Sequence, residues 1–413
     1  MTGGHPAIDK GRLARLLDAI NGFGPDPATG GFNRIGYSDA DMAVRRWFAE
    51  AMTGHGLDVR TDAVGNVFGR FGPAEGPCVM AGSHLDTVPN GGAFDGALGV
   101  AVALECVLAM KDAGFAPRTA IEVVATAEEE GRFGGMLGSQ AIAGVVDPDW
   151  LDAATDNDGI RLVDAMTAQG LDPARVSEAA WRPGAVAAFL ELHIEQGPVL
   201  EGAGVPVGIA SAVSGVCNLE ITLEGQANHS GTTPMNMRAD AFAGLAEIGA
   251  AVPQLIAAHG TDQSRVTIGK VELSPNHAHT IAGRAVFSVI IRDTDETVMV
   301  ALRDRFIAIV AETAGRHGLS FCHDEKSWLA PVELDGGLRD LLAEQAAALG
   351  LPALDMPSGA GHDAQTMQAL CPSALVFVPS RGGVSHAPDE WTEWADIEKG
   401  AALMLAALVQ LVG

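Results

Sequence analysis

The spacing of hydrophobic and polar residues predicts an alternation of helices and strands along most of the chain. Apolar residues recur with helical spacing over residues 9–19 and 38–55, as in amphipathic helices. Residues 58–71 alternate on either side of a Gly-Asn pair, which predicts a hairpin. Strand, loop and helix then alternate as far as Leu200, with loop and short helices expected over 150–182. This order is typical of a mostly parallel sheet with helices on both faces.

The pattern changes near Ser211, which indicates a second domain. Strand alternation recurs three times and helical spacing twice, at 217–224, 239–259, 265–273, 284–292 and 296–317. Strand, helix, strand, strand, helix is an order that suggests a small α+β domain with an antiparallel sheet. Helix, loop and strand resume after Pro331. We therefore expect residues 212–329 to be inserted into a discontinuous α/β domain made of residues 1–211 and 330–413.

Composition narrows the class of protein. The chain has 413 residues, a length sufficient for two domains, and 47% of them are hydrophobic, which allows a large core. Its 26 basic and 52 acidic residues give a net charge of −26, which repels nucleic acid and anionic membranes. We therefore expect neither as a partner.

Cysteine usage and the chain ends predict a cytoplasmic protein. The five cysteines are scattered and form no CxxC pair, which favours reduced thiols. The N-terminus has no apolar signal core. The apolar segment 401–412 is too short to span a bilayer and is expected to be a buried terminal helix.

The most informative chemistry follows the apolar run 78–82. His84 and Asp86 lie two residues apart at its end, so on a strand both side chains point to the same face. A Gly- and Pro-containing loop follows, and Asp95 then stands just ahead of an apolar helix. An imidazole, a carboxylate that orients it and a further carboxylate are the groups with which proteins bind metal ions.

The same residue types recur downstream. Three adjacent glutamates follow the apolar run 121–127, and such carboxylates repel one another unless cations lie nearby. In the run 189–197, alternate residues would share one strand face, and three of them are Glu191, His193 and Glu195. His386 and two acidic residues lie in 382–390. Together these segments carry enough ligands for a hydrolytic site with two metal ions.

The residues and the order of five segments resemble those of one protein family. The segments are GSHLDTVPNGGAFDGALGV, EEEGRF, ELHIEQGPVLE, GQANHSGTTPM and GGVSHAPDE. They resemble the two-zinc amidohydrolases of the hydantoinase/carbamoylase type, which include N-carbamoyl-L-amino-acid amidohydrolases, allantoate amidohydrolases and β-ureidopropionases. The resemblance runs from about Asn33 to Trp394. It implies a metallopeptidase-like catalytic domain, an inserted lid and dimerisation domain, and a homodimer.

The resemblance implies two divalent metal ions per subunit and five ligands, His84, Asp95, Glu130, His193 and His386. Asp95 would bridge the ions. One ion would be completed by His84 with Glu130 or its neighbour, and the other by His193 with His386, although the partition stays open. Zinc is expected, with manganese, cobalt or nickel as alternatives, because the ligands suit several metals.

Asp86 and Glu129 match residues that support catalysis in this family. Asp86 would hold the His84 ring in one tautomer. Glu129 would act as the general base that takes a proton from water and passes it to the leaving nitrogen. The alternative is that Glu128 is the base and Glu129 a ligand. The family usually has one more small residue between Gly131 and Arg132, so we expect that loop to sit differently here.

The resemblance also implies a set of substrate-binding residues: Gln196, His229, Asn276, His279, Arg292 and Gly359. His229, on the lid, would reach a neighbouring subunit's site and stabilise the oxyanion; a structural loop histidine is the alternative. Asn276 and Arg292 would hold the substrate's carboxylate, although Arg292 could instead pair with Asp293 or Asp295. Gln196 would contact the amide end of the substrate.

Two substitutions distinguish this chain from its relatives. His279 stands where the family has an asparagine that helps to bind substrate, and Ala282 stands where it has a proline. The substrate could therefore carry an extra anionic group or differ in shape. Gly359 lies in a Gly-rich loop that can bring backbone N–H groups close to a ligand, and His362 and Asp363 there would be supporting or structural.

These observations predict a metal-dependent amidohydrolase that cleaves the carbamoyl C–N bond of a small carboxylate-bearing N-carbamoyl acid, such as an N-carbamoyl-L-amino acid. Allantoate amidohydrolase and β-ureidopropionase are the nearest alternatives. An aminoacylase or dipeptidase would use an ordinary amide in the same fold. A metal-free binding protein is the non-enzymatic alternative, but the bridging Asp95 and the base Glu129 are both present.

Overall fold

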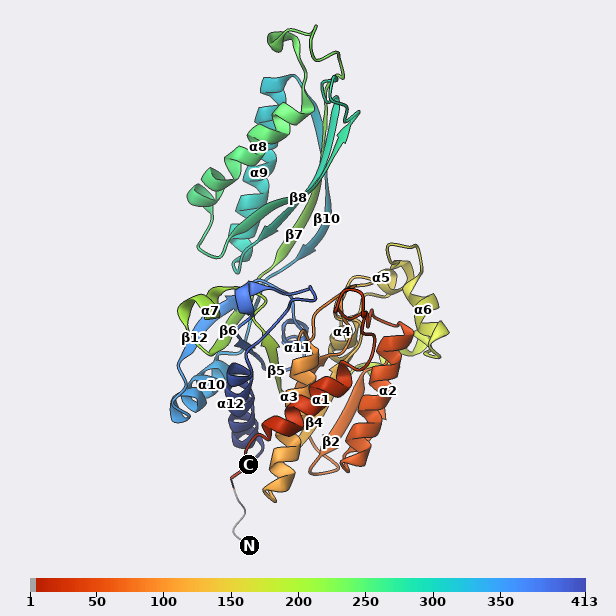
Figure 1. Cartoon of the computed structure of the whole chain (residues 1–413), viewed down its shortest axis with the longest axis vertical. Coiled ribbons are helices and arrows are strands. Elements are labelled where there is room, and N and C mark those ends of the chain that lie inside the picture. Colours follow the sequence, from red (N-terminus) through yellow and green to blue (C-terminus); the bar gives the residue numbers. More distant parts are fainter. Residues whose placement is uncertain (1–4) are drawn as a thin grey trace. The chain divides into compact units, whose positions relative to one another are not determined.

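The computed structural model describes residues 5–413. The chain divides into two compact units (Figure 1). The larger unit comprises residues up to Ser211 together with Leu334–Gly413, and the smaller unit comprises Ala212–Glu333. The chain therefore passes from one unit to the other twice, near residues 211 and 333.

The larger unit is built on a nine-stranded sheet within the described residues. Its centre consists of four mutually parallel strands in the spatial order β4 (Ala120–Thr126), β3 (Cys78–His84), β5 (Val186–Ile194) and β13 (Ser373–Val378). The flanking strands are β1 (Asp58–Thr61), β2 (Val67–Phe71), β6 (Val207–Val213), β11 (Val332–Glu333) and β12 (Ala353–Ser358). The pairing of β11 with the last residues of β6 lies within the bounds of the smaller unit, where the chain passes from one unit to the other. The predicted mostly parallel sheet is confirmed, and so is the hairpin, in which β1 and β2 pair antiparallel.

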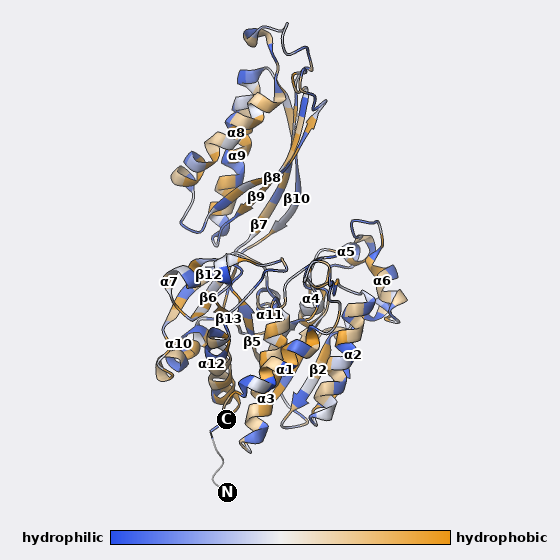
Figure 2. Cartoon of the chain, in the orientation of Figure 1, coloured by the Kyte–Doolittle hydropathy of each residue, from blue (hydrophilic) through white to orange (hydrophobic). Residues whose placement is uncertain are grey.

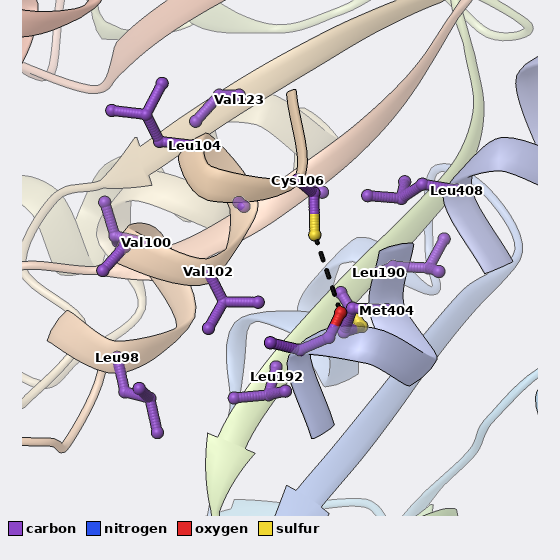
Figure 3. Packing of buried hydrophobic residues seen from close by; sticks show 14 of the residues in the cluster. Leu98, Val100, Val102, Leu104, Cys106, Val123, Leu190, Leu192, Met404 and Leu408 are labelled. Atoms are coloured by element: carbon purple, nitrogen blue, oxygen red, sulfur yellow. Dashed lines mark hydrogen bonds between the residues drawn. The ribbon is translucent and has the colours of Figure 1, made fainter. Parts of the chain in front are cut away.

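A largely apolar helix forms the centre of the larger core. Every residue of α3 (Ala97–Asp112) from Ala97 to Met110 is buried, because the helix is apolar on most sides and lies between the sheet and other helices. The polar exception is Glu105, whose buried carboxylate pairs with Arg12 at 2.6 Å. Figure 3 shows its side chains against those of Val123, Leu190 and Leu192, and Figure 2 shows its apolar colouring. The thiol of Cys106 faces the backbone oxygen of Ala401 on α12 (Trp394–Val412) at 3.9 Å.

The remaining helices of the larger unit surround the sheet. They are α1 (Lys10–Ile20), α2 (Asp39–Gly54), α4 (Leu137–Ala143), α5 (Pro148–Ala153), α6 (Leu162–Ala168), α7 (Val199–Ala203), α10 (Gly336–Ala348) and α11 (Asp363–Met367). Short 3₁₀ turns span Pro173–Ala179 and Arg381–Gly383. The loop and short helices predicted for 150–182 are confirmed.

The smaller unit has an antiparallel sheet in the order β10-β7-β9-β8. The elements are β7 (Val216–Glu224), α8 (Ala241–His259), β8 (Arg265–Ser274), β9 (Arg284–Arg292), α9 (Glu296–His317) and β10 (Ser320–Leu329). Buried side chains of β7 and β9 pack against both helices. The sequence pattern missed β10, because this edge strand is polar and mostly exposed and so lacks hydrophobic alternation.

Among the described residues, α8 is the one helix that is long and apolar enough to cross a membrane, judged by its length and composition only. Its buried side chains Ala241, Leu245, Ile248 and Leu255 belong to the core of the smaller unit. The helix therefore has a role in packing that accounts for part of its apolar character. The five cysteines are all free thiols, of which Cys322 is exposed.

Gly99 provides a test of how closely α3 approaches the central strands. A Cβ atom at this position would lie 2.3 Å from the backbone oxygen of Leu192 and 2.8 Å from Ser83 Cβ. We expect Gly99→Ala to lower the free energy of unfolding by about 1–3 kcal/mol, because overpacking forces the helix away from the sheet. Gly54→Ala is the matched control, since its added Cβ meets no atom within 4 Å. Equal urea midpoints for the two variants would contradict this account.

Candidate metal centre

The predicted ligands meet at the carboxyl ends of the four parallel strands. His84 ends β3, His193 lies near the end of β5, Glu129 and Glu130 follow β4, and His386 follows β13. Asp95 stands just ahead of α3. Parallel strands all end at one edge of the sheet, and ligands in open α/β sheets bind outside that edge. The sheet therefore gathers residues that are far apart in the sequence.

One carboxylate joins two groups of ligands. Asp95 Oδ1 lies 3.3 Å from His84 Nε2 and 3.1 Å from His193 Nε2. Asp95 Oδ2 lies 3.5 Å from His386 Nε2, which is itself 3.3 Å from Glu130 Oε2. Each oxygen of Asp95 thus faces one group, as a bridging ligand would.

The grouping differs from the partition that the resemblance implied, which the sequence left open. His84 and His193 share the first group, and Glu130 and His386 share the second. The sequence had suggested His84 with Glu130 or its neighbour, and His193 with His386. Neighbouring strands β3 and β5 place the two strand histidines side by side, which the linear order of motifs does not reveal. Glu129 Oε2 lies 3.5 Å from His84 Nε2 and so borders the first group.

Backbone carbonyls orient both strand histidines. His84 Nδ1 lies 3.1 Å from the carbonyl oxygen of Asp86, and His193 Nδ1 lies 2.9 Å from that of Ile194. With Nδ1–H donating to a carbonyl, each ring directs the lone pair of Nε2 toward Asp95. This tautomer is the one that a metal ligand requires.

The carboxylate of Asp86 has a different contact from the one expected. It lies 4.0 Å from His84 Nδ1, farther than the residue's own carbonyl, so the backbone holds that ring. Asp86 Oδ2 instead accepts the backbone N–H of Glu130 at 3.0 Å, and Oδ1 lies 3.4 Å from the guanidinium of Arg45. Arg45 is buried and also binds Asp41 at 2.7 Å. Asp86 therefore links the end of β3 to Glu130, with Arg45 as the buried counter-charge.

The buried carboxylates of the site, taken without any bound ion, favour the uptake of positive charge. Burial raises the pKa of Glu129 well above its usual value and that of Glu130 to about 7. Burial would lower the pKa values of His84 and His193, but surrounding carboxylates outweigh it and raise both. Contact with Asp95 raises the pKa of His386 to about 9.

Asp95 shows the opposite behaviour. Burial would raise its pKa, but the imidazole of His193, followed by those of His386 and His84, holds it well below the usual value. Imidazole and carboxylate donors in buried, convergent groups fit divalent ions such as zinc, and also manganese, cobalt or nickel. The residues present therefore fit the predicted metal ions.

A third group, Glu191, His193 and His362, also lies close together. Both oxygens of Glu191 are already engaged, by Ser83 Oγ at 2.6 Å and by the backbone N–H of Ala364 at 2.9 Å. His362 packs edge-on against His193 with ring centroids 4.6 Å apart. These contacts fix the position of β5 and support His193. Nearby, Asp363 accepts a hydrogen bond from Thr126.

Glu128 organises a loop beside the centre. Its buried carboxylate accepts the backbone N–H of Phe133 at 2.7 Å, and burial raises its pKa to about 8. Arg132 of the same loop binds Asp156 at 2.9 Å and donates to the carbonyl of Gly36 at 2.9 Å. The loop thus contacts Glu128 through the backbone of Phe133, and Glu129 is the glutamate beside His84.

Gln196 lies at the second group of ligands. Its Nε2 is 2.7 Å from Asp95 Oδ2 and 3.2 Å from His386 Nε2. Its Oε1 is buried and has no hydrogen-bond partner within the part of the chain that the structure describes. Gly359 also belongs to the larger unit, in the loop between β12 and α11.

The other predicted substrate contacts lie in the smaller unit. His229, Asn276 and His279 are exposed, and Arg292 is partly buried at the end of β9. His229 Nδ1 accepts the backbone N–H groups of residues 231 and 232 at 3.0 and 3.2 Å, which leaves Nε2 as an N–H donor. The backbone N–H of His279 donates to His277 Nδ1 at 3.3 Å.

The alternative for Arg292 is an ion pair with Asp293 or Asp295. Asp293 accepts hydrogen bonds from Thr261 and Ser264, and Asp295 caps α9. Burial lowers the pKa of Arg292.

The sequence interpretation missed two supporting residues. Arg45 lies on the buried face of a helix, and a charged residue on such a face is the signal from which its supporting role could have been predicted. Glu390 is 2% exposed and accepts the backbone N–H groups of Phe94 and Asp95 at 2.9 and 3.0 Å. The sequence does offer a signal for Glu390, because it is an acidic residue in a loop, four positions after the predicted ligand His386.

Comparison with known proteins agrees with the fold and identifies the family. Residues 80–410 match Peptidase family M20/M25/M40. The chain is 37% identical over 413 residues to an N-carbamoyl-L-amino-acid amidohydrolase of Paenarthrobacter aurescens, covering 98% of this chain and 99% of that protein. It is 36% identical to an allantoate amidohydrolase of Bacillus subtilis strain 168, covering 93% of each.

A crystal structure gives the same result. An amidase of the hydantoinase/carbamoylase family from Burkholderia multivorans superposes with a TM-score of 0.91 at 32% identity, covering 99% of each chain. The chain therefore belongs to Peptidase family M20/M25/M40, whose enzymes depend on metal ions. Within it, the predicted relationship to amidohydrolases of the hydantoinase/carbamoylase type is confirmed, and with it the hydrolase class.

Proposed function

We propose that this protein is a two-metal amidohydrolase that cleaves the carbamoyl C–N bond of a small N-carbamoyl acid, with an N-carbamoyl-L-amino acid as the first candidate. The products would be an amino acid, ammonia and carbon dioxide. The observation that carries the proposal is the division of the Asp95 carboxylate between two ligand groups. The relative from Paenarthrobacter aurescens supports the choice of substrate.

The ligands would be His84, Asp95 and His193 for one ion, and Asp95, Glu130 and His386 for the other. Divalent ions bound there would supply Lewis acidity and a more acidic water. Glu129, beside the first group, would accept a proton from the attacking water and deliver it to the leaving nitrogen. Because burial favours its protonated form, Glu129 would hold that proton for transfer.

Substrate recognition would involve both units. The unpartnered Oε1 of Gln196 could accept an N–H of the ureido group. The Nε2–H of His229 would donate to the oxygen that becomes negatively charged as the carbonyl turns tetrahedral. Arg292 and Asn276 would bind the carboxylate, and His279 would contact a further polar group. Gly359 would present backbone N–H.

We propose further that the smaller unit is a lid and dimerisation domain, and that the protein is a cytoplasmic homodimer. In this arrangement His229 would serve the metal centre of the partner subunit. The exposure of His229, Asn276 and His279 supports a role for them in contacts outside their own unit.

Allantoate is the second candidate substrate. It also carries a carboxylate beside ureido groups, and the relative from Bacillus subtilis supports it. His279 would suit its additional polar groups better than those of a small carbamoyl amino acid.

Metal-reconstituted assays test the proposal. We expect chelated protein to be inactive and zinc, manganese, cobalt or nickel to restore hydrolysis, because each fits the donor set. A panel of carbamoyl, formyl and acetyl amino acids plus allantoate should be tested with each ion, with ammonia release and amine release as separate measurements. Activity on acetyl but not on ureido substrates would refute the carbamoyl assignment. Full activity of protein shown to be metal-free would refute the metal centre.

Neighbouring glutamates should give opposite phenotypes. We expect Glu129→Gln to keep both metal ions but to lower kcat by about 10²–10⁴-fold, because a proton acceptor is lost. Glu130→Gln should instead weaken metal binding, because its carboxylate faces His386. Elemental analysis and kinetics on both variants, with Glu128→Gln as a third matched substitution, would check this. Exchanged phenotypes would assign the base to Glu130.

Subunit mixing tests whether His229 acts across a dimer. His229→Ala should mainly lower kcat, since its donor is needed most in the transition state. Mixing inactive Glu129→Gln and His229→Ala proteins under subunit exchange should restore activity, because one site of the mixed dimer would contain both intact residues. Confirmed heterodimers without recovery would place both residues of each site in one chain.

A further inference from the structure

We infer that Glu390 is a positioning residue that fixes Asp95 and His386 relative to each other and thereby sets the metal affinity of the Asp95–Glu130–His386 group. This inference rests on the metal centre proposed above. Glu390 itself lies outside both ligand groups.

Glu390 connects two loops that are distant in sequence. Its Oε1 accepts the backbone N–H groups of Phe94 and Asp95, and its Oε2 lies 3.0 Å from the hydroxyl of Ser385, the neighbour of His386. The Ser385 hydroxyl is also 3.0 Å from Asp95 Oδ2. One buried carboxylate therefore holds the backbone of the bridging ligand and contacts the residue beside a second ligand.

The surroundings of Glu390 leave it little freedom. It is 2% exposed, and a Cβ atom at Gly92 would lie 2.2 Å from its carboxyl carbon. Glycine at position 92 thus lets the carboxylate approach the backbone ahead of α3. A side chain confined in this way, with both oxygens in contact with donors, transmits position from one loop to the other.

The two ligand groups depend on this connection to different degrees. His84 and His193 lie on parallel strands whose positions the sheet hydrogen bonds fix. His386 lies in a loop, its side chain is 49% exposed, and its backbone has a positive φ of 55°. Few packing contacts can hold an exposed loop residue in a sparsely populated conformation, so its placement relies on anchors such as Glu390.

Removing the anchor should therefore weaken one metal site selectively. We expect Glu390→Ala to weaken binding at the Asp95–Glu130–His386 group by about 10–100-fold, the range seen when residues supporting metal ligands are lost. The His84–Asp95–His193 group should change less. Glu390→Gln should lie closer to the wild type, because its amide oxygen can still accept both N–H groups while its NH₂ donates to Ser385.

Titration of the metal-free, full-length protein with Co²⁺ is the test, followed by visible absorption and by competition with a chelator. Glu393→Ala is the matched control, since Glu393 lies three residues away and pairs with Arg381 in an exposed ion pair. Unfolding midpoints would be recorded for every variant. Ser385→Ala, which removes the hydroxyl from both Glu390 Oε2 and Asp95 Oδ2 and leaves Glu390 on the Asp95 backbone, should also weaken binding at the Asp95–Glu130–His386 group if Glu390→Ala fails to fold.

The outcomes separate this inference from the proposed function. Two Co²⁺ steps in the wild type and in Glu393→Ala, with one step selectively weakened in Glu390→Ala or Ser385→Ala, would support it. Wild-type-like isotherms for Glu390→Ala and Ser385→Ala, or equal weakening of both steps, would overturn it while leaving the metal centre intact. A wild type that binds fewer than two ions would instead refute the metal centre.

Discussion

The structure of the candidate site depends on a single carboxylate that serves two groups of ligands at once. Asp95 can do so only if its backbone is held ahead of α3 while histidines approach from two sides. Gly96 makes this approach possible: its φ is 61°, and a Cβ there would lie 2.3 Å from the His84 ring. The sheet brings the strand histidines to one side of Asp95, and the loop after β13 brings His386 to the other.

Burying so many acidic groups close together costs free energy through desolvation and repulsion, and neighbouring groups in the fold offset part of this cost. Arg45 is the counter-charge for Asp86 and Asp41, and backbone N–H groups donate to one oxygen each of Glu390 and Glu128. Glu128, Gln196 and His386 all have positive φ values, each of which costs about 1–3 kcal/mol. Such conformations persist where the surrounding structure determines them, and here they cluster around the proposed metal ions. The remaining imbalance of charge is what divalent ions would neutralise.

The two units contribute different kinds of residue to the proposed reaction. The larger unit provides buried, rigidly held groups on a sheet whose central strands are covered on both faces, as metal ligands require. The smaller unit presents exposed polar side chains, and the backbone around His229 still fixes its tautomer. A rigid centre combined with exposed residues that are only proposed to bind substrate is consistent with a family in which related proteins are named for different substrates.

The sequence by itself determined the class of fold, most elements and the family, and it named the candidate ligands, because strand periodicity and short motifs are local properties. It could not determine which candidate ligands lie together, because that depends on the spatial order of strands, in which β3 lies next to β5. Nor could it show that a carbonyl rather than the Asp86 carboxylate orients His84, or that Arg45 and Glu390 support the centre. The strand β10 was missed for a different reason, because its polar, exposed residues show no hydrophobic alternation. The other features arise from contacts between segments up to about 300 residues apart, such as Glu390 with Phe94 at a separation of 296, and only the tertiary structure brings such segments together.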